Sequence, residues 1–153
     1  MPETEIRRLL EKWMEILRIK NNWDVKLDLR SDPSLPKTGD IKIDCDDRKA
    51  ILILNTAGPN WGNPEETICH ELLHLKMYPL DQFTESVITS TFEDGTAASN
   101  LAYINFFLNL EITVEELTKC FLAAFGEDKA LSYGRCESRK SFEELFDGLN
   151  NLG

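Results

Sequence analysis

Residues 69–74 read Cys-His-Glu-Leu-Leu-His and contain the only two histidines of the 153-residue chain. His70 and His74 are four residues apart, so on an α-helix they lie on one face and can both reach a single metal ion. Glu71 lies about 100° round the helix from His70, beside such an ion and not on it. A carboxylate there can accept a proton from water that zinc has made more acidic. The stretch therefore predicts a zinc site with two histidine ligands and Glu71 as general base.

The residues around this HExxH motif favour a helix. Asn63 is a good N-cap, and Pro64 suits the first helical position. Apolar residues recur at every third or fourth position after it, which gives one buried face and leaves the histidines directed elsewhere. Pro79 is expected to end the helix. A chance match to the motif in a chain of this length has a probability of roughly one in a few hundred.

Length, charge and hydropathy limit the classes of protein to consider. A chain of 153 residues is long enough for one domain with a hydrophobic core, so we expect a single domain over residues 1–153. The formal net charge of −10 argues against nucleic acid as a partner. No apolar run reaches the length of a membrane span, and residues 1–5 lack the features of a signal peptide. The expected location is cytoplasmic, with no membrane partner.

The four cysteines are too far apart in the sequence to form a CxxC pair. Without a secretion signal, a disulfide framework is not expected either. We expect free, mostly buried thiols, with Cys69 in the hydrophobic core because its side chain points about 100° away from His70 on the helix.

The first half of the chain alternates between helix and strand patterns. Residues 3–20 have the periodicity of an amphipathic helix, and residues 23–29 alternate as a strand with one buried face does. Residues 41–45 alternate in the same way and are expected to form a β-hairpin with residues 49–55. That second strand has a continuous apolar run, as expected for a strand covered on both faces.

The second half is expected to be helical. Asp81 can cap a helix after Pro79, and residues 97–125 favour one long helix or two, because Thr113 could begin a capping box. Residues 141–149 have an apolar face that is expected to complete the core, with coverage of the metal cleft as the alternative.

A catalytic zinc usually has three protein ligands, and the chain has no third histidine. Asp81 lies seven residues after His74, but it is equally suited to capping the next helix. Glu111 and Glu115 are four residues apart, so on a helix one could bind the metal while the other orients a ligating histidine. They also fit a solvated acidic face. The third ligand is therefore open between Glu111, Asp81 and Glu115.

An HExxH motif followed at a distance by Glu111 and an acid four residues later resembles the gluzincin clan of zinc metallopeptidases. The size of the chain resembles that of the minimal single-domain members, the minigluzincins, and the resemblance covers roughly residues 23–125. It implies that Glu111 is the third zinc ligand and that Glu115, in place of the usual aspartate, supports a histidine. It also implies that residues 49–55 form a sheet edge that holds a peptide, and that Tyr78 or Tyr103 stabilises the oxyanion.

We therefore expect an α+β, zincin-like domain with a small, mostly antiparallel sheet, an HExxH metal helix and a glutamate helix. The expected activity is hydrolysis of peptide bonds in a peptide or protein substrate by a zinc metallopeptidase. The alternative is a non-catalytic module that contains zinc and binds peptides or regulates a partner. A closed four-ligand site would favour this alternative, and Cys136 is the candidate fourth ligand.

Overall fold

Three strands form one small sheet in the computed structural model, which describes residues 1–58, 61–131, 133–137 and 139–150. The strands are β1 (Asp24–Arg30), β2 (Gly39–Asp44) and β3 (Lys49–Asn55), and their order in the sheet is β1-β3-β2. β2 and β3 pair antiparallel, which confirms the predicted hairpin, whereas β1 pairs parallel to β3. The sheet is therefore mixed, and the prediction of a mostly antiparallel sheet is wrong.

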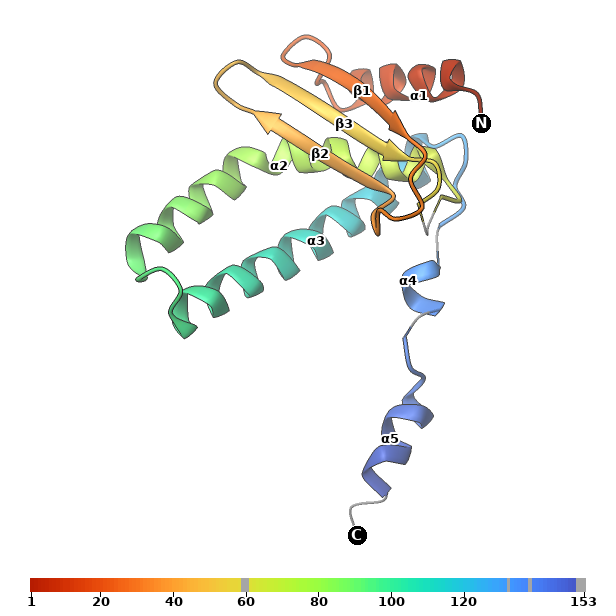
Figure 1. Cartoon of the computed structure of the whole chain (residues 1–153). Helices are drawn as coiled ribbons and strands as arrows, with labels where there is room; N and C mark the ends of the chain where they lie inside the picture. Colours follow the sequence, from red (N-terminus) through yellow and green to blue (C-terminus); the bar gives the residue numbers. More distant parts are fainter. Residues whose placement is uncertain (59–60, 132, 138, 151–153) are drawn as a thin grey trace.

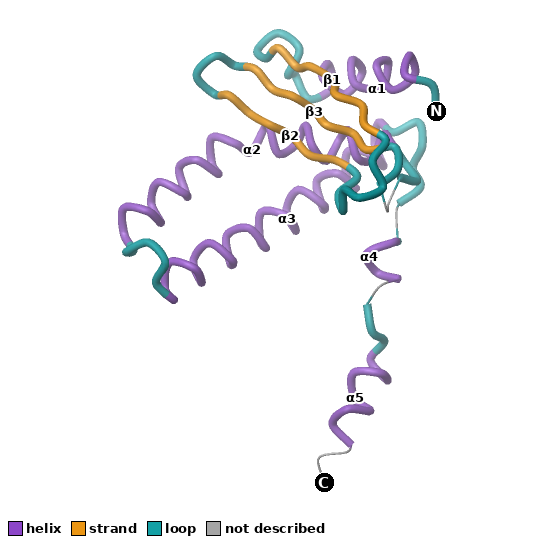
Figure 2. The backbone as a smooth tube through the Cα atoms, viewed as in Figure 1, coloured by secondary structure: helices purple, strands orange, loops and turns teal. Residues whose placement is uncertain are grey.

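One face of the sheet is apolar and packs against two helices, α1 (Glu3–Ile16) and the first part of α2 (Pro64–Thr91), as Figures 1 and 2 show. The register places Leu27, Leu52 and Ile41 in one row across the three strands. Because side chains alternate along a strand, this row and its neighbours two residues away all point towards the helices. They form one buried cluster with apolar residues of α1, α2 and α3, which includes Cys69 as predicted. The other three cysteines are exposed, so the prediction of mostly buried thiols is wrong.

β3 is the central strand, so residues 49–55 are not the sheet edge that the resemblance implied. Leu52, Ile53 and Leu54 are buried, but Ile51 is 36% exposed, because α1 and α2 cover only one face of the sheet. The prediction that this strand is covered on both faces is therefore wrong. β2 alternates between Ile and charged residues, which suits a strand with one open edge. The open edge beside the HExxH helix is therefore that of β2.

α2 begins where the sequence predicts and continues further than expected. The side chain of Asn63 accepts hydrogen bonds from the backbone N–H groups of Glu65 and Glu66, at 3.0 and 3.2 Å. The helix then runs through Pro79 to Thr91. An internal proline removes a single backbone hydrogen bond, and packing against another helix can offset that loss. The prediction that the helix ends at Pro79 is wrong, and so is the N-cap role of Asp81, which lies inside α2.

α3 (Ala97–Phe125) is one uninterrupted helix that runs back along α2. The possible capping box at Thr113 does not break it, because the Thr113 hydroxyl donates to the carbonyl of Asn109 in the preceding turn, at 2.8 Å. The second part of α2, the connection and the first part of α3 project beyond the sheet as a helical hairpin (Figure 1). We call this hairpin, residues 79–112, the arm.

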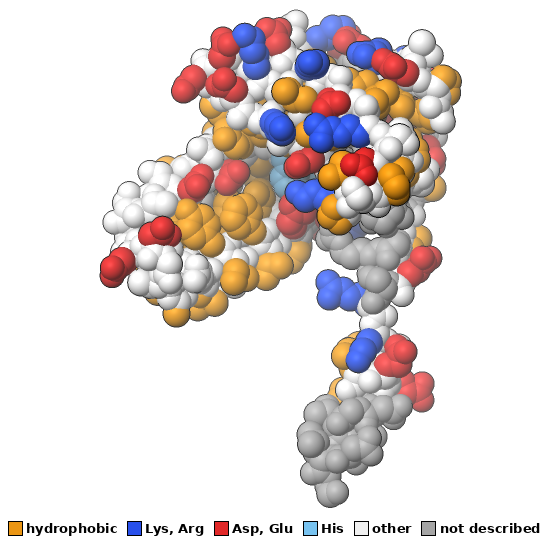
Figure 3. Space-filling model, in the orientation of Figure 1, with side chains coloured by type: hydrophobic (Ala, Val, Ile, Leu, Met, Phe, Trp, Pro, Cys, Tyr) orange, Lys and Arg blue, Asp and Glu red, His pale blue; other side chains and the backbone are white. Residues whose placement is uncertain are grey.

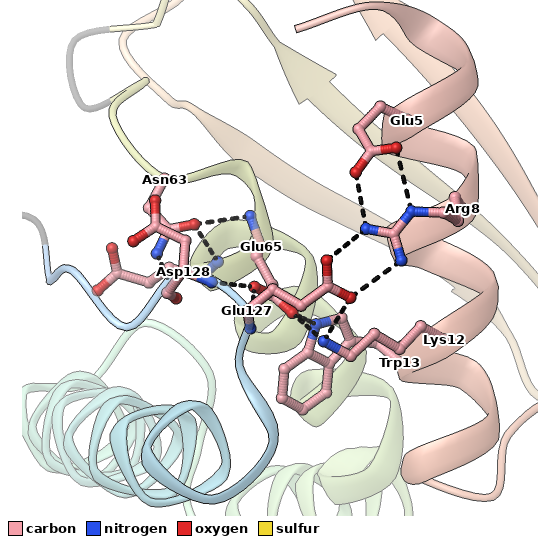
Figure 4. A network of polar contacts seen from close by, with 9 residues as sticks. Glu5, Arg8, Lys12, Trp13, Asn63, Glu65, Glu127 and Asp128 are labelled. Atoms are coloured by element: carbon pink, nitrogen blue, oxygen red, sulfur yellow. Dashed lines mark hydrogen bonds and ion pairs between the residues drawn. The ribbon is translucent and has the colours of Figure 1, made fainter.

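A buried carboxylate joins α1, α2 and the segment after α3 (Figure 4). The side chain of Glu65 is 2% exposed and lies in the first turn of α2. It accepts four hydrogen bonds, from Lys12 Nζ at 2.7 Å, Trp13 Nε1 at 3.0 Å, and the backbone N–H groups of Glu127 at 2.8 Å and Asp128 at 2.9 Å. Asn63 adds two bonds to carbonyls of the same segment. The start of α2 is thereby attached to the end of α3.

The last two helices are α4 (Gly134–Glu137) and α5 (Phe142–Asn150), which stand apart from the sheet in Figure 1. Phe142, Leu145 and Phe146 of α5 are 79%, 55% and 54% exposed. For these three side chains the expectation that the helix completes the core is therefore wrong, and the side chain of Leu149 lies outside the described part of the structure. No helix in the described part of the chain combines the length and the apolar character needed to cross a bilayer.

We expect Glu65→Ala to lower the free energy of unfolding by roughly 3 kcal/mol, because it leaves the indole N–H of Trp13 and two buried backbone N–H groups without their acceptor. It also removes one of the two carboxylates that pair with Lys12. Glu3→Ala is the control, since Glu3 pairs with Arg7 on the exposed side of α1 and its loss should change stability little. Urea unfolding followed by circular dichroism measures both. Equal effects of the two substitutions would contradict the role given to Glu65.

Candidate metal centre

His70 and His74 lie one turn apart on α2 and face the same point. Their Nε2 atoms are 3.1 Å apart, and their side chains are only 16% and 18% exposed. At that distance one imidazole can donate to the other only if their tautomers differ. Two imidazole nitrogens directed at one point are also the arrangement that a shared metal ion requires.

Glu111 of α3 supplies a carboxylate at the same point. One of its oxygens lies 3.3 Å from His74 Nε2 and the other lies 3.8 Å from His70 Nε2. One ligand atom from each of the three residues falls within 4.8 Å of the others. In a tetrahedral site with zinc bonds of about 2.0 to 2.1 Å, ligand atoms are about 3.3 Å apart. The three residues are therefore close enough together to bind one metal ion.

Glu115 lies on α3 one turn from Glu111 and faces the other nitrogen of His70. Its carboxylate is 4.0 Å from His70 Nδ1, which is an ion-pair distance and longer than a hydrogen bond. Because α2 and α3 run antiparallel, His70 faces Glu115, and His74, one turn later on α2, faces Glu111, one turn earlier on α3. Glu115 is therefore placed to orient His70, as carboxylates beside ligating histidines do.

Glu71 points from α2 towards the start of β2 and is 8% exposed. Burial raises its pKa to about 7, although the charge of His74 acts in the opposite direction. Gly39 makes room for it, because a Cβ on Gly39 would lie 2.6 Å from Glu71 Oε1 and 2.6 Å from Thr67 Cγ2. Sequence reasoning missed Gly39. Its signal is a glycine at the start of a strand, which often marks close approach of a side chain or backbone.

These residues lie in a cavity of about 510 Å³ between β2, α2 and α3. Figure 3 shows it as a hollow below the sheet, with a histidine at the bottom. Residues 36–38 close one end, and Tyr78 and Asp81 line the other. Besides Glu71, Glu111 and Glu115, three more acids line the wall, whereas Lys37 is the one lysine in the lining. The cavity therefore favours a ligand with positive charge near the metal centre.

The other predicted residues have different places. Asp81 lines the cavity but does not belong to the group of ligand atoms around His70 and His74. Tyr78 also lines it, whereas Tyr103 is absent from the lining and stacks on Phe107, with ring centroids 6.1 Å apart. Cys136 is exposed on α4, and among the described residues no cysteine joins the group.

The chain matches no protein-family model, no curated protein and no solved structure. The resemblance to gluzincins stays a prediction from the sequence. The structural observation that bears on it is the convergence of two histidines and Glu111 on one point, with Glu71 buried beside them.

We expect Glu111→Ala to weaken zinc binding roughly a thousandfold, because one of three ligands is lost. Asp81→Ala should change zinc affinity by less than about tenfold, since Asp81 affects the site only through its charge. Titration of zinc-free protein against a competing chromophoric chelator measures both constants. The reverse ranking would mean that Asp81 is the third ligand.

We expect Gly39→Ala to lower the free energy of unfolding by about 1 to 3 kcal/mol, because the new methyl group overlaps Glu71 and Thr67. The matched control is Gly62→Ala, since a Cβ on Gly62 would meet no atom within 4 Å. Urea unfolding compares the two variants. If Gly39→Ala proved as stable as the control, the close approach of Glu71 to β2 would be contradicted.

Proposed function

We propose that the protein is a zinc-dependent peptidase in which His70, His74 and Glu111 hold the metal and Glu71 is the general base. The observation that carries this proposal is the group of three ligand atoms within 4.8 Å, with a buried carboxylate on the neighbouring position of the same helix. A site with three protein ligands leaves one position open, which is typical of catalytic zinc. A closed structural site would need a fourth ligand, and none joins the group among the described residues.

Glu71 has the properties that a proton carrier needs. Zinc, when bound, supplies a Lewis acid that polarises a carbonyl group and makes nearby water more acidic. A Glu71 oxygen then accepts the proton of the attacking water and delivers it to the nitrogen that leaves. Burial raises the pKa of Glu71 to about 7, which favours both halves of this transfer near neutral pH, and the charge of a bound zinc acts against that rise. Gly39 allows this carboxylate to remain inside the cavity wall.

The open edge of β2 is suited to hold an extended peptide. The backbone N–H of Asn55 donates to the carbonyl of Thr38 at 2.8 Å, and the register pairs Gly39 with Leu54. In an antiparallel ladder the bonded pairs alternate, so the backbone groups of Gly39, Ile41 and Ile43 point away from β3. These three residues line the cavity. A substrate can therefore add to the sheet as a further strand and place its scissile bond near Glu71.

Tyr78 is the better of the two candidates for stabilising the oxyanion. It lines the cavity one turn after His74, whereas Tyr103 does not line it. Burial raises the pKa of the Tyr78 hydroxyl above its usual value of 10, so the group keeps its proton at neutral pH and can donate a hydrogen bond.

We expect Glu71→Gln to keep about one zinc per chain and to cut a broad library of peptides at least a thousandfold more slowly, because glutamine cannot accept the proton of water. Glu116→Gln is the control, since Glu116 pairs with Lys119 on the exposed side of α3. Metal analysis and mass spectrometry of the cleaved library provide the two measurements. Loss of zinc in Glu71→Gln, or undiminished cleavage of the library, would contradict the role of Glu71 as general base.

A further inference from the structure

α3 exposes a row of large apolar side chains on the arm. Five of them are between 50% and 62% exposed, and we call them the apolar stripe: Leu101, Ile104, Phe107, Leu108 and Ile112. Hydrophobic side chains cover much of the arm in the face that Figure 3 shows. An exposed apolar area of this extent usually marks a surface that binds a partner.

The stripe is continuous with the metal centre. Phe107 and Leu108 precede Glu111 by four and three residues, so they lie one turn from it on the same side of α3. Ile104 lies a further turn along the arm. Glu111 lines the cavity, so a chain that leaves the cavity in this direction passes directly onto the stripe.

The charges around the arm limit what can cover it. Residues 77–118 contain seven acids and no lysine, arginine or histidine. A second copy of this chain also carries a net charge of −10, and α5 carries Glu143 and Glu144, so both would meet like charge. An anionic membrane surface is disfavoured for the same reason. A polypeptide that is apolar and positively charged fits best.

The direction of β2 tells which part of a substrate reaches the arm. Gly39, at the start of β2, lies against Glu71, whereas Asp44, at the end of β2, lies near enough to Tyr78, one turn after His74, to help raise the pKa of its hydroxyl. β2 therefore runs towards the arm, as Figure 1 shows. A substrate that pairs antiparallel to β2 runs the opposite way, so the residues before its scissile bond lie at the arm.

We propose that the apolar stripe binds the part of the substrate that lies on the N-terminal side of the scissile bond. The substrate class is polypeptides with an apolar, positively charged segment before the cleavage site. This inference rests on the proposed peptidase activity. The cavity selects the extended chain around the scissile bond, and the stripe selects the segment before it.

The test compares three peptides that share one eight-residue core found by library cleavage. The first is the core alone, the second has ten residues of leucine, alanine and lysine added at its N-terminus, and the third has the same ten at its C-terminus. We expect zinc-loaded protein to cleave the N-terminally extended peptide about tenfold more efficiently than the core, measured as kcat/KM. No such gain is expected for the C-terminally extended peptide, and an equal gain for both would overturn the proposal.

The double variant Ile104→Gln with Leu108→Gln should reduce the ratio of kcat/KM between extended and core peptides to about one. Phe83→Gln is the matched control, because Phe83 is an exposed apolar residue of the arm on α2, about 140° round that helix from His70. Phe83→Gln should have the same ratio of kcat/KM between extended and core peptides as the unaltered protein. A ratio that survives the double variant would overturn the proposal. If the double variant fails to fold by circular dichroism, the two single variants give the same comparison.

The proposed peptidase activity and the proposed binding of substrate by the apolar stripe can be tested separately. If zinc-loaded protein cleaves no peptide of the library, no core is found and the proposed activity is wrong. Fluorescence anisotropy with the labelled ten-residue segment of leucine, alanine and lysine then tests the stripe alone. Tighter binding to the unaltered protein than to the double variant supports the stripe, and equal binding overturns it.

Discussion

The antiparallel register between α2 and α3 determines where every candidate ligand lies. Moving α3 by one residue would shift its side chains by about 1.5 Å along the axis and turn them by about 100°, which would remove Glu111 from the histidines. The register is held at one end by the buried carboxylate of Glu65, which binds the backbone just after α3. From there, Glu115 faces His70 and Glu111 faces His74. The hydrogen bonds between Glu65 and the backbone after α3 thus help to hold Glu111 and Glu115 opposite the two histidines.

The sheet supplies the second constraint, because the edge of β2 forms one wall of the cavity and covers Glu71. A carboxylate in this place is costly to ionise, and the structure keeps it there by the absence of a side chain at Gly39. The same edge leaves its outward backbone groups beside the metal centre. The buried carboxylate of Glu71, the open hydrogen-bonding groups of β2 and the three candidate ligands therefore come together where β2, α2 and α3 meet.

Local signals in the sequence predicted the elements and most of the site, and non-local packing accounts for the errors. The cap at Asn63 and the hairpin follow from short-range patterns, whereas the residues alone left the third ligand open between Glu111, Asp81 and Glu115, and the structure places Glu111 beside the histidines. The predicted end of the helix at Pro79 was wrong because the packing of α2 against α3 outweighs the loss of one hydrogen bond. Strand order is a property of the whole sheet, so the sequence did not reveal that β1 joins β3 in parallel and leaves β2 at the edge. The need for glycine at position 39 could be recognised only once the structure placed it next to Glu71.

The central claim is that one metal ion is held by two residues of α2 and one of α3. Anomalous diffraction at the zinc edge, from crystals of the protein loaded with one equivalent of zinc, tests it most directly. The account predicts a single peak within about 2.2 Å of His70 Nε2, His74 Nε2 and a Glu111 oxygen, with Glu71 close by but not bound. A peak that is liganded by Asp81 or by a cysteine, or no peak at this position, would contradict it.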